Sequence, residues 1–188
     1  MRVILASSSI RRREMLDDLN IEYEVVPSKK EEFVDSYLSP SDLVMKLAKM
    51  KGDDVFKDNE DALILSFDTL VFKGDEVLGK PQSEEELIKM MRLLSDDTHK
   101  VVTGFYMKAK DYEFLTYEEA SVHMMKMSDE DIINYSKTDE PYDKAGGYAI
   151  QGYMGRYIDY IEGDYFTIVG MPKALVYQKV REYLNKWL

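Results

Sequence analysis

The stretch from Ser7 to Arg13 combines small hydroxyl side chains with three consecutive arginines, directly after a short apolar run. The apolar run predicts a strand, and the residues after it predict the first turn of a helix. First-turn N–H groups lack partners within their helix, the helix dipole is positive at that end, and guanidinium groups add full charge. The stretch therefore predicts a site for an anionic oxygen group such as phosphate. The alternative is a helix capped by Ser8 or Ser9 with solvated arginines.

A single carboxylate follows one of the most apolar runs in the chain. Residues 62–67 (ALILSF) predict a buried strand that stops at Asp68. Because strand ends in α/β folds border the ligand crevice, Asp68, with Thr69 after it, is a candidate catalytic residue. A carboxylate there can orient a water molecule, act as general base or bind a metal ion. The alternative is a turn aspartate that caps the following segment.

Two further segments are candidates for contact with a phosphorylated ligand. Lys80 stands between Gly79 and Pro81, so a fixed loop presents its ammonium group either to phosphate oxygens or to solvent. The segment 141–152 (PYDKAGGYAIQG) contains glycines that let backbone approach a ligand, and Gln151, whose amide can donate and accept hydrogen bonds at a base edge. Its glycine spacing matches neither a dinucleotide-binding fingerprint nor a Walker A loop, so a loop with positive φ angles is the alternative.

The composition limits the chemistry that the chain can perform. It has 188 residues, no cysteine, two histidines and a formal net charge of −11. Absence of cysteine excludes disulfides, thiol nucleophiles and thiolate zinc sites, and the isolated His99 and His123 are expected to be strand residues, so any metal must be bound by oxygen. The negative charge weighs against a nucleic-acid partner. An acidic protein that binds a polyanion needs a local cationic pocket, a bridging divalent ion such as Mg²⁺, or both.

A metal site would need a second carboxylate beside Asp68. Glu31 and Glu32 lie in a polar loop, where acidic pairs are usually solvated, and Glu32 is our choice for that second ligand. No run approaches the roughly 18 to 20 apolar residues that span a bilayer, and the amino terminus lacks the apolar stretch of a secretory signal. We therefore expect a cytoplasmic protein with no membrane partner.

Strands and helices are expected to alternate along the chain. Apolar and alternating runs predict strands at residues 2–6, 21–26, 62–67, 70–72 with a returning strand after a turn at 73–76, 99–108, 114–127 and 157–161. Helical spacing and capping residues predict helices at residues 10 to about 20, from Ser39 or Ser41, from Ser83, at 128–136 and from Pro172. A hairpin around Lys110-Asp111 excludes a purely parallel sheet. We expect a mixed α/β sheet, with the first and last parts of the chain in one lobe, the middle in another, and a cleft between them.

Seven segments together resemble one protein family over nearly the whole chain. They are LASSSIRRR, LAKMK, SFDT, LGKP, THKVVTG, EPYDKAGGYAIQG and GDYFTIVGMP. Their order and spacing are similar to those of the Maf family of nucleoside triphosphate pyrophosphatases. The resemblance implies hydrolysis between the α and β phosphates with a divalent cation, Mg²⁺ or Mn²⁺. It also implies a Maf/ITPase-like mixed sheet with helices, in which residues 1–188 form one domain of two lobes around a deep substrate groove.

The resemblance also implies a role for individual residues. Asp68 matches the catalytic acidic position and, with Glu32, a position near the metal. The phosphate-binding positions are Ser7, Arg11, Arg12, Lys51 and Lys80. In the subgroup that acts on dTTP and UTP, pyrimidine selectivity accompanies the positions of Arg11, Thr69 and Gln151. Arg13 is then an additional surface charge.

Two other functions stay open beside dTTP/UTP hydrolysis. One is the sister subgroup that acts on 7-methyl-GTP, and the other is a non-catalytic nucleotide-binding regulator of cell division and septum formation. A homodimer is an open alternative to a monomer. The chain departs from the family pattern at Ile10, at Ser66-Phe67 and at Asp96-Asp97. Phe67 either narrows the pocket or points into the core. Asp96-Asp97 stands in place of a Gly-Arg-like pair of the family, and a positive charge is thereby lost.

Overall fold

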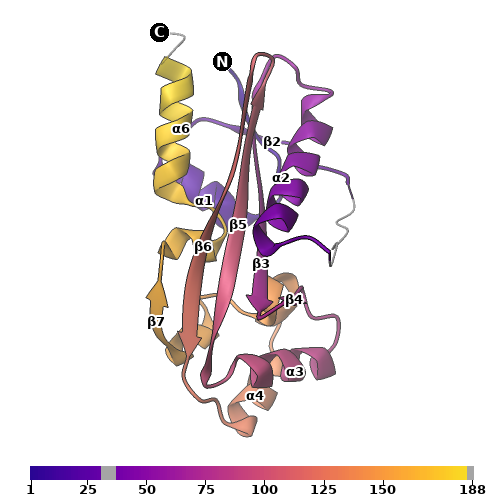
Figure 1. Ribbon diagram of the computed structural model, residues 1–188, viewed down its shortest axis with the longest axis vertical. Helices are drawn as coiled ribbons and strands as arrows, with labels where there is room; N and C mark the ends of the chain where they lie inside the picture. Colours follow the sequence, from indigo (N-terminus) through magenta and orange to yellow (C-terminus); the bar gives the residue numbers. More distant parts are fainter. Residues whose placement is uncertain (31–36, 186–188) are drawn as a thin grey trace. The chain divides into compact units, whose positions relative to one another are not determined.

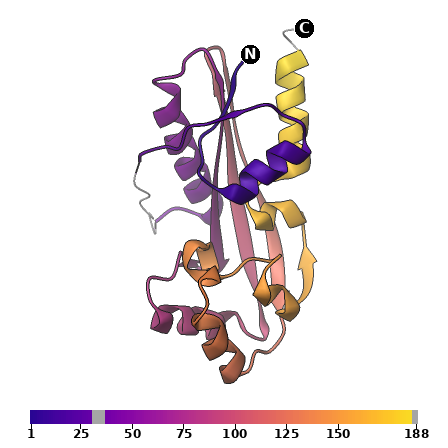
Figure 2. The ribbon, with the colours of Figure 1, turned by 180° about the vertical axis from the view of Figure 1, so that it is seen from behind.

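A computed structural model describes residues 1–30 and 37–185 (Figures 1 and 2). The strands are β1 (Val3–Leu5), β2 (Glu24–Val25), β3 (Leu63–Lys73), β4 (Glu76–Leu78), β5 (Asp97–Ala109), β6 (Tyr112–Met124) and β7 (Ile158–Glu162). The helices are α1 (Ile10–Asp18), α2 (Pro40–Phe56), α3 (Glu84–Leu94), α4 (Asp129–Ser136), α5 (Tyr165–Val169) and α6 (Lys173–Asn185). Three short 3-10 helices are η1 (Glu140–Asp143), η2 (Ala145–Gly147) and η3 (Tyr153–Tyr157).

The strands form one mixed sheet in the order β2-β1-β3-β5-β6-β7, and β4 pairs with β3. Strand β1 pairs in parallel with β2 and β3, whereas the pairs β3–β4 and β6–β7 are antiparallel. The expected mixed α/β fold is therefore confirmed. The turn between β5 and β6 falls at residues 110–111, as predicted. Strand β2 is shorter than the predicted 21–26, and helix α5 was not predicted.

The prediction that the buried strand stops at Asp68 is wrong, because β3 continues to Lys73. Its second half has its own antiparallel partner, with Phe72 opposite Val77 of β4. Aromatic and β-branched residues on both sides of the aspartate favour extended backbone, so one polar residue does not end the strand. The parallel pairing with β1 does end earlier, at the pair Leu5–Leu65. Asp68 therefore lies beyond that pairing but inside the strand.

The chain divides into two compact units that share three strands. Unit 1 contains residues 1–68, 103–118 and 170–188, and unit 2 contains residues 69–102 and 119–169. Unit 1 has a buried cluster of Ile4, Ala6, Val55, Ala62 and Ile64. The larger cluster of unit 2 includes Val71, Leu87, Met91, Tyr135 and Tyr148. Strands β3, β5 and β6 contribute residues to both units.

Three helices begin at the serine caps that the sequence predicts. The side chains of Ser39, Ser83 and Ser128 each accept a hydrogen bond from a backbone N–H in the first turn of α2, α3 and α4. In unit 2, α3 and α4 lie side by side (Figures 1 and 2). The predicted apolar face of α6 is buried at Val176, Val180 and Tyr183, and Trp187 lies outside the described residues.

Helix α2 and strand β5 meet at two glycines in unit 1. A Cβ atom on Gly104 would lie 2.4 Å from the carbonyl oxygen of Val44, and one on Gly52 would lie 2.4 Å from Cδ1 of Tyr106. Both positions therefore need a residue without a side chain for α2 to pack this closely. The contact sets the distance between α2, which carries Lys51, and the sheet.

The departures from the family pattern have clear positions. Phe67 is fully buried and its ring stacks on that of Phe105 at 4.9 Å between centroids, so it points into the core. Asp96 has a left-handed φ of 60°, a conformation that aspartate adopts more readily than most residues. Asp97 forms an ion pair with Lys73 and accepts a hydrogen bond from the N–H of Thr98 at 2.6 Å.

Candidate functional site

A buried ion pair between Asp68 and Lys51 is the first component of the candidate site. Side chains alternate along a strand, so Ser66 and Asp68 share one face of β3. On that face, the Ser66 hydroxyl donates to the carbonyl of Ala48, and the Lys51 ammonium group donates to Oδ1 of Asp68. Both hydrogen bonds therefore join β3 to α2. The side chain of Asp68 is 4% exposed and that of Lys51 13%.

The loop before α1 forms the second component. Oγ of Ser7 accepts hydrogen bonds from the N–H of Ser9 at 3.2 Å and from Nη1 of Arg12 at 3.0 Å. Nε of Arg12 donates to the carbonyl of Gly170 at 2.9 Å, and its guanidinium carbon lies 5.6 Å from the centroid of the Phe67 ring. Side chains alternate along β3, so Phe67, with Arg12 on its ring, lies on the face of the strand opposite to that of Asp68. Arg11 is partly buried in the same turn.

The start of α1 meets the interpretation as a capped helix only in part. Ser9 occupies the N-cap position, but within the described residues its side chain makes no capping hydrogen bond, and no acidic residue lies in the first turn. Ser7 binds Arg12 instead, which orients a cation at the positive end of the helix. Nη2 of Arg13 donates to the carbonyl of Ser8 at 2.9 Å, so Arg13 supports the loop rather than being only a surface charge.

In unit 2, the Lys80 loop and the glycine-rich segment are joined. The N–H of Gly146 donates to the carbonyl of Gly79 at 3.0 Å. Gly146 and Gly147 have φ angles of 69° and 71°, as in the alternative of a loop with positive φ angles. A Cβ atom on Gly147 would lie 2.5 Å from Cδ1 of Leu87, so the segment is tightly packed on α3. The side chains of Lys80 and Gln151 are exposed.

The predicted site residues fall into two groups. Those in unit 1 are Ser7, Arg11, Arg12, Lys51 and Asp68, and those in unit 2 are Thr69, Lys80 and Gln151. The contacts above bring together Ser7 with Arg12 and Lys51 with Asp68, and they join the loop of Lys80 to the segment of Gln151. Thr69 follows Asp68 along β3 and is partly buried. Glu32 lies outside the described residues.

The described residues offer few carboxylates for a metal ion near Asp68. Within residues 1–30 and 37–185, no group of three or more His, Cys, Asp or Glu side chains could hold a metal ion. Of the two predicted ligands, Asp68 alone is described. Mg²⁺, however, is commonly bound by one or two carboxylates together with substrate phosphates. The donor chemistry of Asp68 fits that mode of binding.

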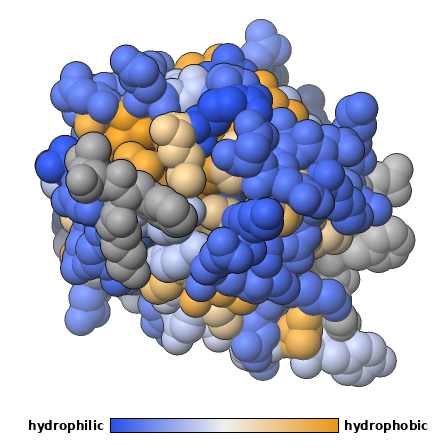
Figure 3. All heavy atoms as spheres, turned by 90° about the horizontal axis from the view of Figure 1, so that it is seen from above, coloured by the Kyte–Doolittle hydropathy of each residue, from blue (hydrophilic) through white to orange (hydrophobic). Residues whose placement is uncertain are grey.

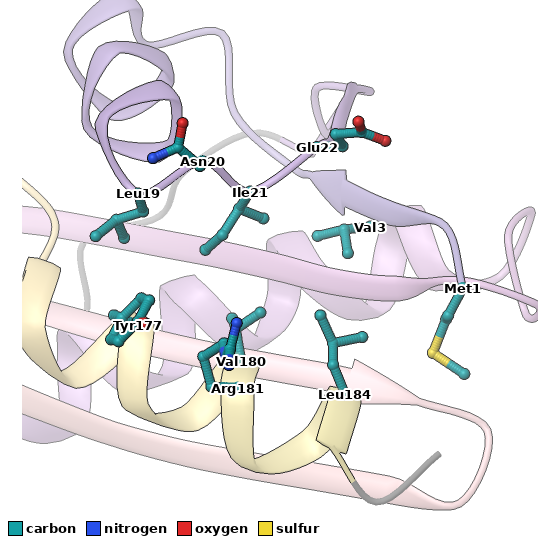
Figure 4. Close-up of a pocket in the computed structure, with 10 residues that line it drawn as sticks. All are labelled: Met1, Val3, Leu19, Asn20, Ile21, Glu22, Tyr177, Val180, Arg181 and Leu184. Atoms are coloured by element: carbon teal, nitrogen blue, oxygen red, sulfur yellow. The ribbon is translucent and has the colours of Figure 1, made fainter. Parts of the chain in front are cut away.

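A hollow of about 370 Å³ in unit 1 is distinct from these residues. Figure 4 shows it between α6 and the amino-terminal segment, with mostly apolar side chains around it. Its lining residues are Met1, Val3, Leu19, Asn20, Ile21, Glu22, Tyr177, Val180, Arg181 and Leu184. Figure 3 views the end that carries the termini and shows hydrophilic side chains over most of that face. Of the predicted site residues that the structure describes, none lines the hollow. In the described part of the chain, no helix is both long and apolar enough to cross a membrane.

A buried contact that sequence reasoning missed joins β5 to the glycine-rich segment. His99 lies in β5, as expected for a strand residue, and its Nε2 is 2.6 Å from the hydroxyl of Tyr148. The two rings also meet edge to face, with centroids 5.4 Å apart. Burial, followed by the charge of Lys73, lowers the pKa of His99 from 6.5 to about 4. Burial also raises the pKa of Tyr148. The histidine is therefore neutral in the folded protein near pH 7.

This histidine should make the protein less stable in mild acid. The unfolded chain binds a proton at His99 as the pH falls through 6.5, whereas the folded protein binds it only near pH 4. The stabilisation present above pH 6.5 is thus lost progressively down to about pH 4, by about 3 kcal/mol in total. Denaturant unfolding of wild type and His99→Gln between pH 7 and 4 measures this loss. The variant should lose about 3 kcal/mol less over that range, and equal losses would contradict the prediction.

The fold and the site define an α/β protein with a buried lysine–aspartate pair and an arginine-bearing loop before its first helix. The Maf-like protein family matches residues 2–183, and the chain belongs to this family. A dTTP/UTP pyrophosphatase of Bacillus cereus is 40% identical over 182 residues, covering 97% of this chain and 95% of the relative. A dTTP/UTP pyrophosphatase of Aquifex aeolicus is 42% identical with the same coverage. The Staphylococcus aureus Ham1 protein shares the fold, with a TM-score of 0.52, 15% identity, and coverage of 85% of this chain and 81% of that one.

Proposed function

We propose that this protein hydrolyses dTTP and UTP between the α and β phosphates, releasing the nucleoside monophosphate and pyrophosphate. The observation that carries the proposal is the buried Asp68–Lys51 pair, and a second cation, Arg12, is held at the start of α1 by Ser7 and by the carbonyl of Gly170. Relatives of about 40% identity over 97% of the chain are dTTP/UTP pyrophosphatases, which supports the same substrate class here. We also propose that the protein acts in the cytoplasm, as we expect from its sequence.

Asp68 is the proposed base in this reaction. It orients a water molecule and accepts its proton as the water oxygen bonds to the α-phosphorus. The bond from that phosphorus to the bridging oxygen breaks, and pyrophosphate leaves. Lys51 holds the carboxylate in position through the ion pair. A positioned base of this kind typically contributes 10²- to 10⁴-fold to the rate.

The cationic side chains have a second task, which is to neutralise the triphosphate. Arg11, Arg12, Lys51 and Lys80 are the proposed set, and Ser7 adds a hydroxyl group. Charge stabilisation dominates phosphoryl transfer, because the transition state spreads negative charge over oxygens that preorganised cations can meet. Asp68 and Glu32 would hold a divalent cation, Mg²⁺ or Mn²⁺, which supplies further charge neutralisation when bound.

Selection of the base is assigned to Arg11, Thr69 and Gln151. A panel of dTTP, UTP, CTP, dATP, GTP and 7-methyl-GTP, assayed side by side for pyrophosphate release with Mg²⁺ and with Mn²⁺, tests the proposal. We expect the highest kcat/KM with dTTP and UTP. Preference for a purine would reject the substrate class, with 7-methyl-GTP pointing to the sister subgroup. Nucleotide binding without turnover would favour a regulatory protein instead.

A further inference from the structure

We propose that Glu140 is a positioning residue that fixes the turn carrying Gln151, and that it thereby contributes to selection of the pyrimidine base. The inference rests on the proposed function, in which Gln151 contacts the base. It concerns a carboxylate that has no proposed contact with phosphate or with the reacting atoms. All the contacts that support it lie within unit 2.

Gln151 lies at the tip of a tight turn. The N–H of Gly152 donates to the carbonyl of Ala149 at 3.0 Å, which closes a four-residue turn with Gln151 in its third position. The side chain of Gln151 is exposed. Such a turn presents the amide group in a defined direction only if the backbone on both sides of it is held.

Glu140 holds the backbone directly after the turn. Both carboxylate oxygens are 3.1 Å from the N–H of Tyr153, which donates to them. The hydroxyl of Tyr135 faces two acceptors and shares its one proton between Oε1 of Glu140 at 3.2 Å and the carbonyl of Gly147 at 3.0 Å. One buried hydroxyl thus connects the carboxylate after the turn with the glycine-rich segment before it. Burial and the Glu140 charge raise the pKa of Tyr135, so its hydroxyl keeps the proton that it donates.

Gly152 leaves the space that Glu140 occupies. A Cβ atom there would lie 2.2 Å from Oε1 of Glu140, far inside van der Waals contact. The backbone of Gly152, with φ −97° and ψ −156°, is open to other residues, so the glycine is required for space rather than for conformation. This makes Gly152→Ala a way to displace the carboxylate without removing it.

Aromatic contacts fix the two ends of the segment. The ring of Tyr153 stacks on that of Tyr135 at 5.4 Å, and the guanidinium carbon of Arg156 lies 3.9 Å from the Tyr153 ring centroid. Before the turn, Tyr148 is buried and hydrogen bonded to His99. Gln151 therefore projects from a turn whose flanking backbone is anchored at Tyr148 and at Tyr153. Glu140 is the charged member of the second anchor.

The first test is kinetic, on the full-length protein with dTTP and CTP. Glu140→Ala should raise the KM for dTTP about five- to tenfold with kcat within about twofold, and should reduce the preference for dTTP over CTP. Glu140→Gln should restore most of the loss, because an amide oxygen can still accept from Tyr153. A purely structural role would instead lower the active fraction, and so kcat, for both nucleotides equally.

Asp164 provides the matched control within the same unit. Its carboxylate also accepts two backbone hydrogen bonds, from Phe166 at 3.2 Å and from Thr167 at 3.0 Å. Asp164→Ala therefore removes the same kind of contact away from the Gln151 turn. We expect it to leave the KM for dTTP and the preference over CTP unchanged. An equal rise in KM in both variants would overturn the specific role of Glu140.

A double variant shows whether Glu140 acts through Gln151. If it does, Glu140→Ala/Gln151→Ala should have the same KM for dTTP as Gln151→Ala alone, since the turn then has no amide left to orient. Multiplicative losses would overturn the inference. Hydrogen exchange of the Tyr153 amide gives a readout independent of turnover. Exchange should be faster in Glu140→Ala and in Gly152→Ala, and unchanged exchange would show that Glu140 does not hold this backbone.

The outcomes separate the inference from the proposed function. A wild-type protein that hydrolyses none of the nucleotides contradicts the proposed function and removes the inference with it. Wild-type activity on dTTP with an unaltered KM in Glu140→Ala contradicts the inference alone. Failure of both Glu140 variants to fold would assign the carboxylate to stability rather than to positioning.

Discussion

An Asp68→Asn variant should remain folded and lose at least about a hundredfold in kcat for dTTP hydrolysis. The amide has nearly the shape of the carboxylate, and its oxygen can still accept the hydrogen bond that Lys51 donates to Oδ1. It cannot accept the proton of the attacking water. Steady-state pyrophosphate release at saturating dTTP measures the loss, and circular dichroism with thermal unfolding verifies the fold.

The neighbouring Asp53 provides the control for this variant. Asp53 is also paired with a lysine, since Oδ2 lies 3.3 Å from Nζ of Lys49, but its side chain is 41% exposed. Asp53→Asn should keep kcat within about twofold, because an exposed pair contributes little. Pyrophosphate release near the wild-type rate in Asp68→Asn would exclude Asp68 from the chemistry.

A Lys51→Met variant should lose both activity and stability. Methionine keeps the length of the side chain but removes the ammonium group that faces a carboxylate of 4% exposure. Breaking a buried ion pair on one side typically costs about 3–5 kcal/mol, because a charge stays in a medium of low dielectric constant. We expect a loss of about 3 kcal/mol in the free energy of unfolding by denaturant, together with a large loss of dTTP turnover.

A double variant separates charge from packing in that result. Lys51→Met/Asp68→Asn buries no charge at this place, so its destabilisation should be smaller than the sum of the single losses by about 2 kcal/mol. Lys49→Met, on the same helix with its side chain 39% exposed, should cost no more than about 1 kcal/mol. Additive losses in the double variant would show that the ion pair does not contribute through its charge.

Local signals in the sequence were sufficient for most of the secondary structure. Ser39, Ser83 and Ser128 begin helices because each satisfies a first-turn N–H that no other helical group can reach. The hairpin turn at 110–111 follows from two β-rich runs separated by polar residues. These features depend on neighbours within a few residues, which the sequence displays directly.

The site depends on contacts that no local signal contains. Helical spacing alone does not tell which of Lys49 and Lys51 faces a carboxylate on β3, and the resemblance to a family, not periodicity, singled out Lys51. The continuation of β3 beyond Asp68 is set by its pairing with β4. Glu140 was missed because both of its oxygens bind the backbone N–H of Tyr153, a group that almost every residue carries.

The glycine contact between α2 and β5 affects which amino-acid substitutions the chain can accept near Lys51. At Gly104 the approach is to a backbone carbonyl, the one of Val44, rather than to a side chain that could be exchanged for another. The placement of Lys51 over the sheet therefore depends partly on main-chain atoms, which substitutions elsewhere in the core do not alter. Side chains around this contact can drift in sequence while the lysine keeps its distance to Asp68.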